Sequence, residues 1–439
     1  MSGEGTVVPG VQGVGHAAPS DEQGTEQGVA HSPDWRPLHI AMVGQKGLPA
    51  TFGGIEHHVE HLGRRLVERG HRVTVYCRSS YGEIPSRKYL GMDLVPAATV
   101  GTKHLDAIVH SLTSTAKGLA SGADIVHYHG IGPGLVAPVP RFLSRSRVVM
   151  TVHGLDHQRA KWGAAAQAVL GTAHWMSGRV PDHVVVVSKA LEEHYRTRFG
   201  REAELIPNGV VEWPAVPASA LPAGHGLEPG RYALFVGRLV PEKRPDLLIE
   251  AFRRVPGDHR LAIVGDSSFS DDYSRRLRDL AAADPRVVFT GFAYGDELAA
   301  LYQHAGVFVQ PSALEGLPLT LLEAASHDAP VLVSDIPPHR EVLGEGSARH
   351  QVVPVDSVDA LAGAVSLMLQ HPRPRDAASR AWRSSVLQRH SWDASAAQLE
   401  ALYLRAATGR PVVAAPGAHG PRGGRLLREQ RTASLRDAG

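Results

Sequence analysis

The chain has 439 residues, of which 6% are aromatic, and a formal net charge of +2. This length suffices for two or three domains with buried cores. The small net charge excludes a general attraction to nucleic acid, so nucleic acid is not an expected partner. The single cysteine, Cys77, excludes an internal disulfide framework. No run reaches the roughly 18 apolar residues of a membrane span, and we expect a cytoplasmic protein.

Both ends of the chain are predicted to be disordered. Residues 1–35 contain neither Lys nor Arg and no apolar run, which excludes a secretory signal and predicts a disordered leader. Residues 409–439 are rich in Gly and Arg, and we expect them to form a disordered basic tail.

Between these ends the chain alternates apolar strands with helices. In residues 36–211, strands are predicted at 37–44, 71–77, 123–130, 147–154 and 182–188, and helices at 55–70, 104–122, 162–180 and 189–200. Residues 212–230 are rich in Pro, Ala and Gly and predict a linker. The alternation resumes in residues 231–392, and we expect residues 393–408 to form a helix that crosses back to the first domain. This order predicts the α/β class, with two Rossmann-like doubly wound domains facing a cleft.

The motifs of several common nucleotide-binding proteins are missing. The first strand leads into "GQKGLPATFGG", which lacks the G-x-G-x-x-G spacing, and the chain has neither a GxxxxGK[ST] loop nor a D-x-D triplet. The hypothesis of a nicotinamide-binding protein therefore loses its main support, and we expect neither a cofactor nor a metal ion. A diphosphate ligand would have to be neutralised by side chains and helix ends.

The second domain offers such groups. "GRLVPEKRPD" places Arg238 and Lys243 in the turn after the first strand of this domain, a spacing that suits two neighbouring phosphates. In "EGLPLTLLE", the Gly-Leu-Pro after Glu315 opens a helix whose free N–H groups favour an anion, and Glu323 lies in its second turn. Taken singly, the two motifs are also compatible with a solvated loop and an amphipathic surface helix.

Together these motifs resemble a known family. R-x-x-x-x-K, the E-x7-E of "EGLPLTLLE", "GG" and "TVHG" in the first domain, "IPNG" and "SDIPPHREV" resemble the retaining GT-B glycosyltransferases of family 4. The resemblance extends over residues 37–407. The segments "GLPATFGGIEHHVEHL" and "HGLDHQRAKWG" look most like a bacterial rhamnosyltransferase-like subgroup of surface polysaccharide synthesis.

The resemblance implies roles for single residues. Arg238 and Lys243 would hold the diphosphate of the donor and stabilise the leaving group. His153 would lie close to the anomeric centre. Glu315 would bind hydroxyls of the transferred sugar, and Glu323 those of the ribose. The expected catalytic residues are His153, Arg238, Lys243 and Glu315.

Other residues are expected to contact substrate. Gly53 and Gly54 precede the first helix and would let backbone N–H groups approach phosphate or the donor sugar. Arg159 and Lys161 in "HQRAKWG" would meet a phosphate of the acceptor, although surface salt bridges explain them equally well. The further expected substrate-binding residues are Gly316, Leu317 and Asn208.

The implied function is metal-independent transfer of a sugar, with retention, from a nucleotide-diphosphate sugar to a polysaccharide or lipid-linked glycan. The resemblance further implies attack by the acceptor from the leaving-group face, which would explain why no paired-carboxylate base is evident. A sugar-nucleotide epimerase or a phosphorylase on the same fold, and a non-catalytic scaffold that binds a nucleotide sugar, are the alternatives.

Two helices leave alternatives open. His57 and His61 have the i,i+4 spacing of zinc ligands, but no third ligand is evident, and an exposed polar helix face is the preferred interpretation. Trp162 and Trp175 bracket an Ala-rich helix that is compatible with core packing and with a membrane interface. Peripheral contact with the inner face of the membrane is therefore an alternative to a purely cytoplasmic location.

Overall fold

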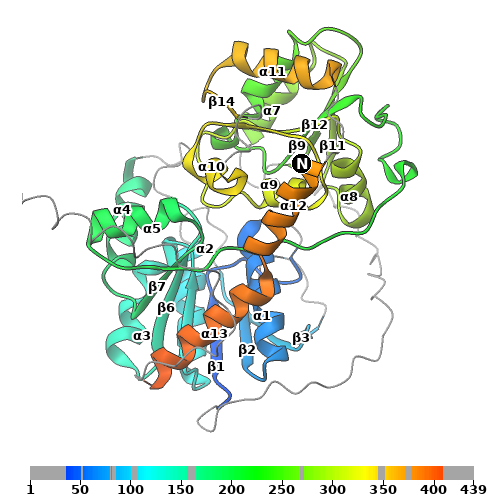
Figure 1. Cartoon of the computed structure of the whole chain (residues 1–439). Helices are drawn as coiled ribbons and strands as arrows, with labels where there is room; N and C mark the ends of the chain where they lie inside the picture. Colours follow the sequence, from blue (N-terminus) through cyan, green and yellow to red (C-terminus); the bar gives the residue numbers. More distant parts are fainter. Residues whose placement is uncertain are drawn as a thin grey trace, which may run out of the picture. The chain divides into compact units, whose positions relative to one another are not determined.

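The computed structural model describes residues 36–50, 53–79, 81, 86–99, 106–155, 164–266, 271–344, 352–371 and 377–408. The predicted leader, the predicted basic tail, Arg159, Lys161 and Trp162 lie outside the described residues. The described residues from Pro37 onward form one compact unit with two β-sheets, each at the centre of one α/β domain (Figure 1).

The first sheet has the strand order β3-β4-β2-β1-β5-β6-β7-β8. All neighbouring strands pair in parallel except β3 and β4. Every residue of β1 and β5 is buried, as expected for parallel strands that are covered on both faces. The strands are β1 (His39–Val43), β2 (Arg72–Arg78), β3 (Lys88–Tyr89), β4 (Met92–Ala97), β5 (Ile125–His129), β6 (Arg147–Val152), β7 (His183–Val186) and β8 (Glu204–Leu205).

The helices of the first domain follow the apolar pattern of the sequence. α1 (Gly54–Glu68) buries Val59, Leu62 and Leu66 of the predicted apolar seam, whereas Ile55 is only partly buried. The other helices here are α2 (Asp106–Ala120), the 3-10 helix η1 (Gly132–Leu135), α3 (Pro138–Leu143), α4 (Ala164–Ser177) and α5 (Lys189–Phe199).

The hairpin of β3 and β4 is absent from the sequence prediction. In β4, Met92 and Leu94 are buried and alternate with the partly buried Asp93 and Val95, which is the pattern of a half-buried strand. The alternating run is short and contains Pro96, which lowers the strand signal.

The second sheet has the order β11-β10-β9-β12-β13-β14, and each pair of neighbours is parallel. Two sheets whose strands are parallel apart from the β3–β4 pair, with intervening helices, confirm the predicted α/β class. The strands are β9 (Tyr232–Val236), β10 (Arg260–Val264), β11 (Val287–Gly291), β12 (Val307–Gln310), β13 (Val331–Ser334) and β14 (Val352–Val353). The helices are α6 (Pro245–Phe252), α7 (Asp271–Ala281), α8 (Gly295–Gln303), α9 (Leu319–Ser326), α10 (Pro337–Leu343), α11 (Val358–Gln370) and α12 (Ala377–Arg389), and a 3-10 helix, η3 (Ala218–Ala220), lies in the preceding segment.

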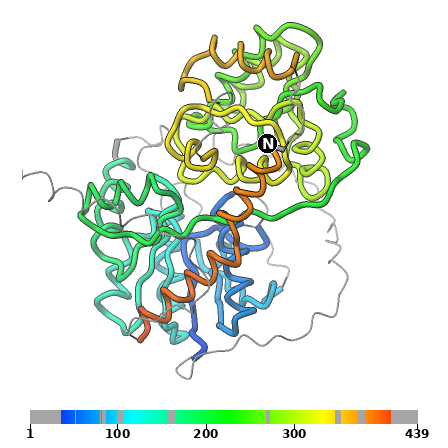
Figure 2. The backbone as a smooth tube through the Cα atoms, viewed as in Figure 1, coloured from blue at the N-terminus to red at the C-terminus, as the bar shows by residue number. Residues whose placement is uncertain are grey.

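The last helix, α13 (Trp392–Thr408), packs on the first domain. Figures 1 and 2 show it beside α1, and Leu399 and Leu402 share a hydrophobic core with residues of α1 and β1. The Oη of Tyr403 lies 2.5 Å from His127 Nδ1 on β5, so the helix also reaches the sheet. α13 therefore completes the core of the first domain, although it follows the second domain in the chain.

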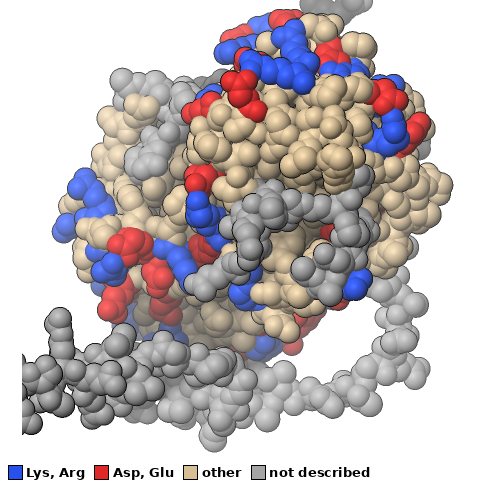
Figure 3. Space-filling view, turned by 45° about the horizontal axis from the view of Figure 1, so that its top comes forward, with Lys and Arg blue, Asp and Glu red and all other residues tan. Residues whose placement is uncertain are grey.

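The surface shows no separation of charge on the face in Figure 3. Acidic and basic side chains lie intermingled there, which fits the net charge of +2. Among the helices of the described ranges, none combines the length and the apolar character needed to cross a bilayer.

We predict that Leu402→Ala destabilises the protein by about 2–5 kcal/mol, because it leaves a cavity where α13 packs on the first domain. Urea unfolding followed by circular dichroism measures this effect. Leu367→Ala, at a position on α11 that is 57% exposed, is the matched control and should cost far less. Equal destabilisation by the two variants would contradict the role given to α13.

Candidate functional site

The predicted site residues lie after strands of both sheets. In the second domain, Lys243 ends the 3-10 helix η4 (Pro241–Lys243) after β9, and Glu315 lies in the loop after β12. In the first domain, His153 directly follows β6, and Gly53 immediately precedes α1. In doubly wound parallel sheets, ligands bind beyond the carboxyl ends of the strands, which is where these residues lie.

Glu315 is held by three hydrogen-bond donors. Its Oε1 accepts hydrogen bonds from Lys243 Nζ, Gln310 Nε2 and Ser312 Oγ, each 2.8 Å long. The side chains of Lys243 and Glu315 are only 14% and 11% exposed. Within the described ranges no donor is seen on Oε2. This second oxygen can therefore accept hydrogen bonds from a ligand.

The surroundings of Glu315 keep it ionised. Burial alone would raise the pKa of its carboxyl group, but the charge and hydrogen bond of Lys243 outweigh burial and, with smaller effects of His339 and Ser312, lower that pKa to about 2. Gly237 gives the lysine room, because a Cβ atom there would lie 3.1 Å from Lys243 Cδ. The site thus holds a carboxylate and an ammonium in direct contact at neutral pH.

Glu323 lies in α9 and is oriented by Tyr302. The Oη of Tyr302 donates a 2.9 Å hydrogen bond to Glu323 Oε2, and the tyrosine ring stacks on His327. Burial raises the pKa of Glu323, although His57 and the bond from Tyr302 counteract part of that rise. In the described part of the chain no donor is seen on Oε1, so one oxygen is fixed and the other can meet a ligand.

Two glycines bring the domains into contact. A Cβ atom on Gly316 would lie 1.8 Å from the carbonyl oxygen of His153, so a larger residue does not fit there. A Cβ atom on Gly54 would lie 3.1 Å from Leu319 Cδ1. The space beside Gly316, predicted to admit a ligand, therefore holds the His153 carbonyl in this conformation. The same contact places His153 next to the loop of Glu315.

Gly53 permits the turn that begins α1. Its φ is +103°, in the region that favours glycine, and a Cβ atom there would lie 2.2 Å from Glu56 Oε2. Glu56 is buried, and its Oε1 accepts a 2.9 Å hydrogen bond from the backbone N–H of Lys46. Glu56 therefore fastens the loop between β1 and α1.

The remaining predicted residues differ in what they can offer a substrate. Arg238 lies in the turn between β9 and η4 and is partly buried. Leu317 packs its side chain in the hydrophobic core, which leaves its backbone for a substrate contact. Arg159 and Lys161 lie outside the described residues.

A cluster of histidines around His153 is absent from the sequence prediction. The ring centroid of His153 lies 4.5 Å from that of His58 on α1 and 5.7 Å from that of His129 on β5. Asn208, predicted as a substrate contact, has its Oδ1 2.6 Å from His58 Nδ1. The signal for part of this cluster is "HYH" at the end of β5, because alternate residues of a strand share one face.

The clustered histidines are neutral. Burial lowers the pKa of His58 to about 4, and it lowers the pKa values of His129 and His153 well below the ordinary range. At pH 7 each imidazole therefore has one N–H group and one nitrogen lone pair. Such a ring can donate one hydrogen bond and accept another, or bind a metal ion.

His57 and His61, the i,i+4 pair on α1, do not lie on a fully exposed polar helix face, which is the interpretation preferred from the sequence. His61 stacks on Trp392 of α13, with 4.8 Å between ring centroids, and burial lowers its pKa to about 3. His57 is partly buried. The polar face of α1 is thus covered in part by α13 rather than fully exposed.

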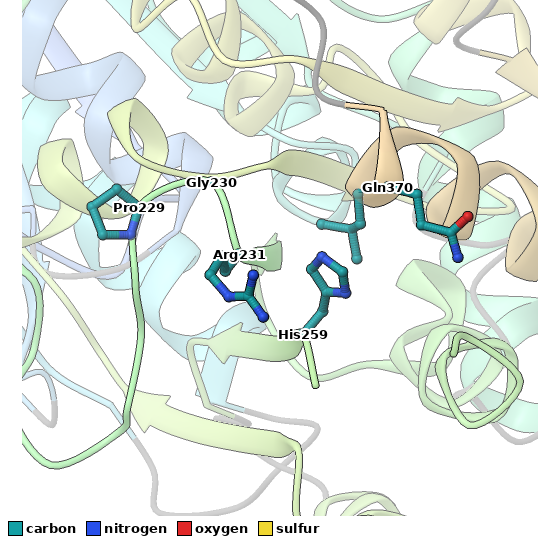
Figure 4. A pocket seen from close by; sticks show the side chains of 6 residues that line it. Pro229, Gly230, Arg231, His259 and Gln370 are labelled. Atoms are coloured by element: carbon teal, nitrogen blue, oxygen red, sulfur yellow. The ribbon is translucent and has the colours of Figure 1, made fainter. Parts of the chain in front are cut away.

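A pocket of about 430 Å³ lies in another part of the second domain (Figure 4). Arg231, on its wall, directly precedes β9, and His259 directly precedes β10. The pocket is therefore at the amino ends of the strands, at the edge of the sheet opposite Lys243 and Glu315. This position does not suit the substrate of a doubly wound sheet.

Comparison with known proteins covers both domains. The family model described as Glycosyltransferase Family 4 matches residues 52–212, and the model described as Glycosyl transferases group 1 matches residues 221–384. A GDP-mannose-dependent alpha-(1-6)-phosphatidylinositol monomannoside mannosyltransferase of Mycolicibacterium smegmatis is 30% identical over 379 residues, 81% of this chain and 95% of that protein. A glycogen synthase of Mycobacterium tuberculosis is 28% identical over 411 residues, 85% of this chain and 96% of that protein. The sucrose-phosphate synthase of Thermosynechococcus elongatus has the same fold, with a TM-score of 0.72, 24% identity and coverage of 84% and 98% of the two chains.

Two doubly wound domains with largely parallel sheets, matching the sucrose-phosphate synthase structure, give the chain the GT-B fold. The likeness to the mannosyltransferase over 81% of this chain and the match of the first domain place the chain in glycosyltransferase family 4. The predicted fold and the predicted enzyme class are thereby confirmed.

We predict that Glu315→Gln lowers the free energy of unfolding at pH 7 by on the order of 3 kcal/mol, because the folded state holds this carboxyl group at a pKa of about 2. A lowered folded-state pKa stabilises the protein above the unfolded value, and the contribution is lost as the pH falls from about 5 to about 2. The difference between wild type and variant should therefore shrink over this range in urea titrations. Glu250→Gln, at an exposed site on α6, is the control and should stay within about 0.5 kcal/mol of wild type. A difference between wild type and Glu315→Gln that does not change with pH would contradict the prediction.

Proposed function

We propose that this glycosyltransferase moves a sugar from a nucleotide-diphosphate sugar to a glycan or lipid-linked acceptor, with retention and without a divalent cation on the diphosphate. The observation that carries the proposal is the 2.8 Å contact between Lys243 Nζ and Glu315 Oε1 in a nearly buried setting. It puts a cation suited to phosphate beside a carboxylate suited to sugar hydroxyls. A nucleotide-diphosphate sugar presents these two chemical groups next to each other.

Lys243 and Arg238 neutralise the diphosphate in this proposal. A lysine ammonium has three N–H donors, and the bond to Glu315 uses one of them. Within the described residues, the group of three side chains close enough to share a metal ion consists of histidines, whereas magnesium on a diphosphate prefers oxygen ligands. The mannosyltransferase relative is named for its dependence on GDP-mannose, which supports a donor of this type.

Glu315 and Glu323 bind the two sugars of the donor. Glu315 offers Oε2 to the hydroxyls of the transferred sugar, while Lys243, Gln310 and Ser312 hold its Oε1. Glu323 offers Oε1 to the ribose hydroxyls, while Tyr302 holds its Oε2. Because each carboxylate has one fixed oxygen, the free oxygen is already oriented before the donor binds, which reduces the entropy lost on binding.

His153 acts beside the anomeric carbon. As a neutral ring it can stabilise the positive charge that develops there without adding a positive charge of its own. The bond from the anomeric carbon to the diphosphate oxygen breaks, and the acceptor hydroxyl attacks from the same face. Its proton passes to the departing phosphate oxygen, and Lys243 and Arg238 stabilise the resulting negative charge.

The acceptor in our proposal is a lipid-linked or polysaccharide precursor. The first-domain segments that resemble the rhamnosyltransferase-like subgroup support a role in surface polysaccharide synthesis. The name of the mannosyltransferase relative includes a phosphatidylinositol acceptor, which supports a lipid-linked one. Contact with the membrane surface would bring such an acceptor to the site.

Exposed apolar residues on α3 suit that contact. Phe142 and Leu143 are 71% and 80% exposed, and the exposed Arg145 and Arg147 follow them. Apolar side chains beside arginines favour an interface with anionic lipid. On α4, the half-exposed Trp175 is the second candidate.

We predict that Lys243→Ala and Glu315→Ala each lower kcat by about 10²–10³-fold, because each removes a preorganised partner of the transition state. Release of nucleoside diphosphate from UDP-, GDP- and dTDP-sugars in the presence of chelator measures the rate, and NMR of the product gives the anomeric configuration. Glu250→Ala at its exposed site is the control. Wild-type turnover in Glu315→Ala would refute the assigned role. Free epimerised sugar as the product would instead indicate an epimerase, and donor binding without turnover would indicate a scaffold.

We predict that the double variant Phe142→Ser, Leu143→Ser binds anionic phosphatidylglycerol vesicles about tenfold or more weakly than wild type, because two apolar anchors are lost. Co-sedimentation with vesicles measures the binding. Leu367→Ser, an exposed leucine on α11, is the control and should bind as wild type does. A loss seen with Trp175→Ser but not with the double variant would move the contact to α4.

A further inference from the structure

The histidine cluster next to the sugar-transfer site has the geometry of a metal site. His58, His129 and His153 each offer one ring nitrogen, and these nitrogens lie within 4.8 Å of one another. His129 Nδ1 and His153 Nε2 are 3.4 Å apart. Two imidazole nitrogens bound to one tetrahedral zinc ion at about 2.0–2.1 Å are separated by about 3.4 Å. One pair of the cluster therefore already has the spacing of zinc ligands.

His58 supplies an unused lone pair to this cluster. Its Nδ1–H donates to Asn208 Oδ1 at 2.6 Å, so the lone pair lies on Nε2. Nε2 is buried and, within the described residues, has no hydrogen-bond partner. An unsatisfied buried nitrogen costs free energy, and a cation shared by the three rings would remove that cost.

His129 is oriented in the same manner. Its Nε2 lies 3.1 Å from Met42 Sδ, a weak acceptor, so Nε2–H points to the sulfur and the lone pair lies on Nδ1, facing His153. Histidines that bind metals commonly donate their other ring N–H to an outer partner, which fixes the tautomer. Asn208 and Met42 occupy this outer position for His58 and His129.

We propose that His58, His129 and His153 bind a transition-metal cation of the zinc type. Three neutral imidazoles favour Zn²⁺, Co²⁺, Ni²⁺ or Cu²⁺ over Mg²⁺ and Ca²⁺, which prefer oxygen. Closing the three nitrogens to tetrahedral spacing takes a shift of about 1.4 Å at most, and His153, which is only partly buried, is the member with room to move. His153 then transfers its proton from Nε2 to Nδ1, so the three ligands stay neutral, and a water molecule completes the coordination.

Metal binding would oppose sugar transfer. This consequence rests on the proposed function, in which His153 lies beside the anomeric carbon. A cation that holds His153 Nε2 against His58 and His129 withdraws the ring from the donor sugar. Zinc should therefore compete with the nucleotide sugar, and the metal-free enzyme should be the active form.

The test uses the full-length protein after removal of metals with a chelator. Zn²⁺ is titrated against a chromogenic chelator, and Co²⁺ is titrated while the visible absorption of four-coordinate cobalt is recorded. We expect one ion per chain, and we expect His58→Gln to weaken Zn²⁺ binding by more than about 100-fold. Asn208→Leu should weaken it by about 10–100-fold and Asn208→Asp, which still accepts from His58, should restore it.

Matched controls separate this cluster from the other histidines. His57→Gln changes the neighbouring residue on α1, and His194→Gln breaks a pair in which His174 Nε2 and His194 Nε2 are 3.0 Å apart. Both variants should bind Zn²⁺ within about twofold of wild type. If His58→Gln does not fold, as judged by circular dichroism, His153→Gln takes its place. Equal affinity of wild type and the cluster variants, or a loss confined to the control variants, would overturn the proposal.

Kinetic measurements with Zn²⁺ distinguish failure of the proposed metal site from failure of the proposed function. If zinc binds but the KM for the nucleotide sugar does not rise with Zn²⁺, the metal site stands and the role of His153 in sugar transfer falls. If zinc does not bind while Glu315→Ala lowers kcat as predicted, the metal site falls and the proposed function stands.

Discussion

The contact between Lys243 and Glu315 is the interaction on which the proposed donor-binding edge of the second domain depends. Taking a carboxylate out of water costs several kcal/mol, and three donors on one oxygen offset that cost. One donor follows β9, and the other two, Gln310 and Ser312, lie at the end of β12 and just after it, so the contact fastens the loops of two adjacent strands. Apolar packing usually stabilises a fold at least as well as a buried ion pair does. A requirement to bind phosphate and sugar hydroxyls explains the pair better than stability does.

The first domain contributes neutral groups to the same place. His153 meets Gly316 through its backbone carbonyl, and burial keeps the His153, His129 and His58 rings uncharged. The second domain contributes charge. This division suits a reaction in which the leaving group becomes negative at one end while positive charge develops on the anomeric carbon at the other.

Periodicity and short motifs predict much of this arrangement. The apolar seam of α1, the parallel strands and the turn with Lys243 follow from local pattern, because each depends on neighbours in the sequence. The contact of Gly316 with His153 does not, because 163 positions of sequence separate the two residues and only the folded backbone brings them together. The local pattern predicts a ligand contact at Gly316. The carbonyl oxygen of His153 that occupies this space is found only in the structure, because it comes from a distant part of the sequence.

The histidine cluster is a second feature of the site that local sequence patterns do not predict. Each member is unremarkable alone: His58 falls on a helix with two other histidines, His129 ends a buried strand and His153 follows another. The sequence shows His57 and His61 as an i,i+4 pair, because helical spacing is visible in one dimension, although an exposed polar helix face is the preferred interpretation. Folding turns His61 toward Trp392 and brings His58 to β5 and β6 instead. The pair suggested by spacing is therefore replaced by the triad of His58, His129 and His153. This triad depends on sheet register, because His129 lies opposite Thr151 on β6 and His153 comes two residues after Thr151. The ring that is proposed to act on the sugar thus shares its surroundings with two nitrogen ligands, and the same packing that keeps it neutral for transfer also leaves the lone pair of His58 Nε2 open to a cation.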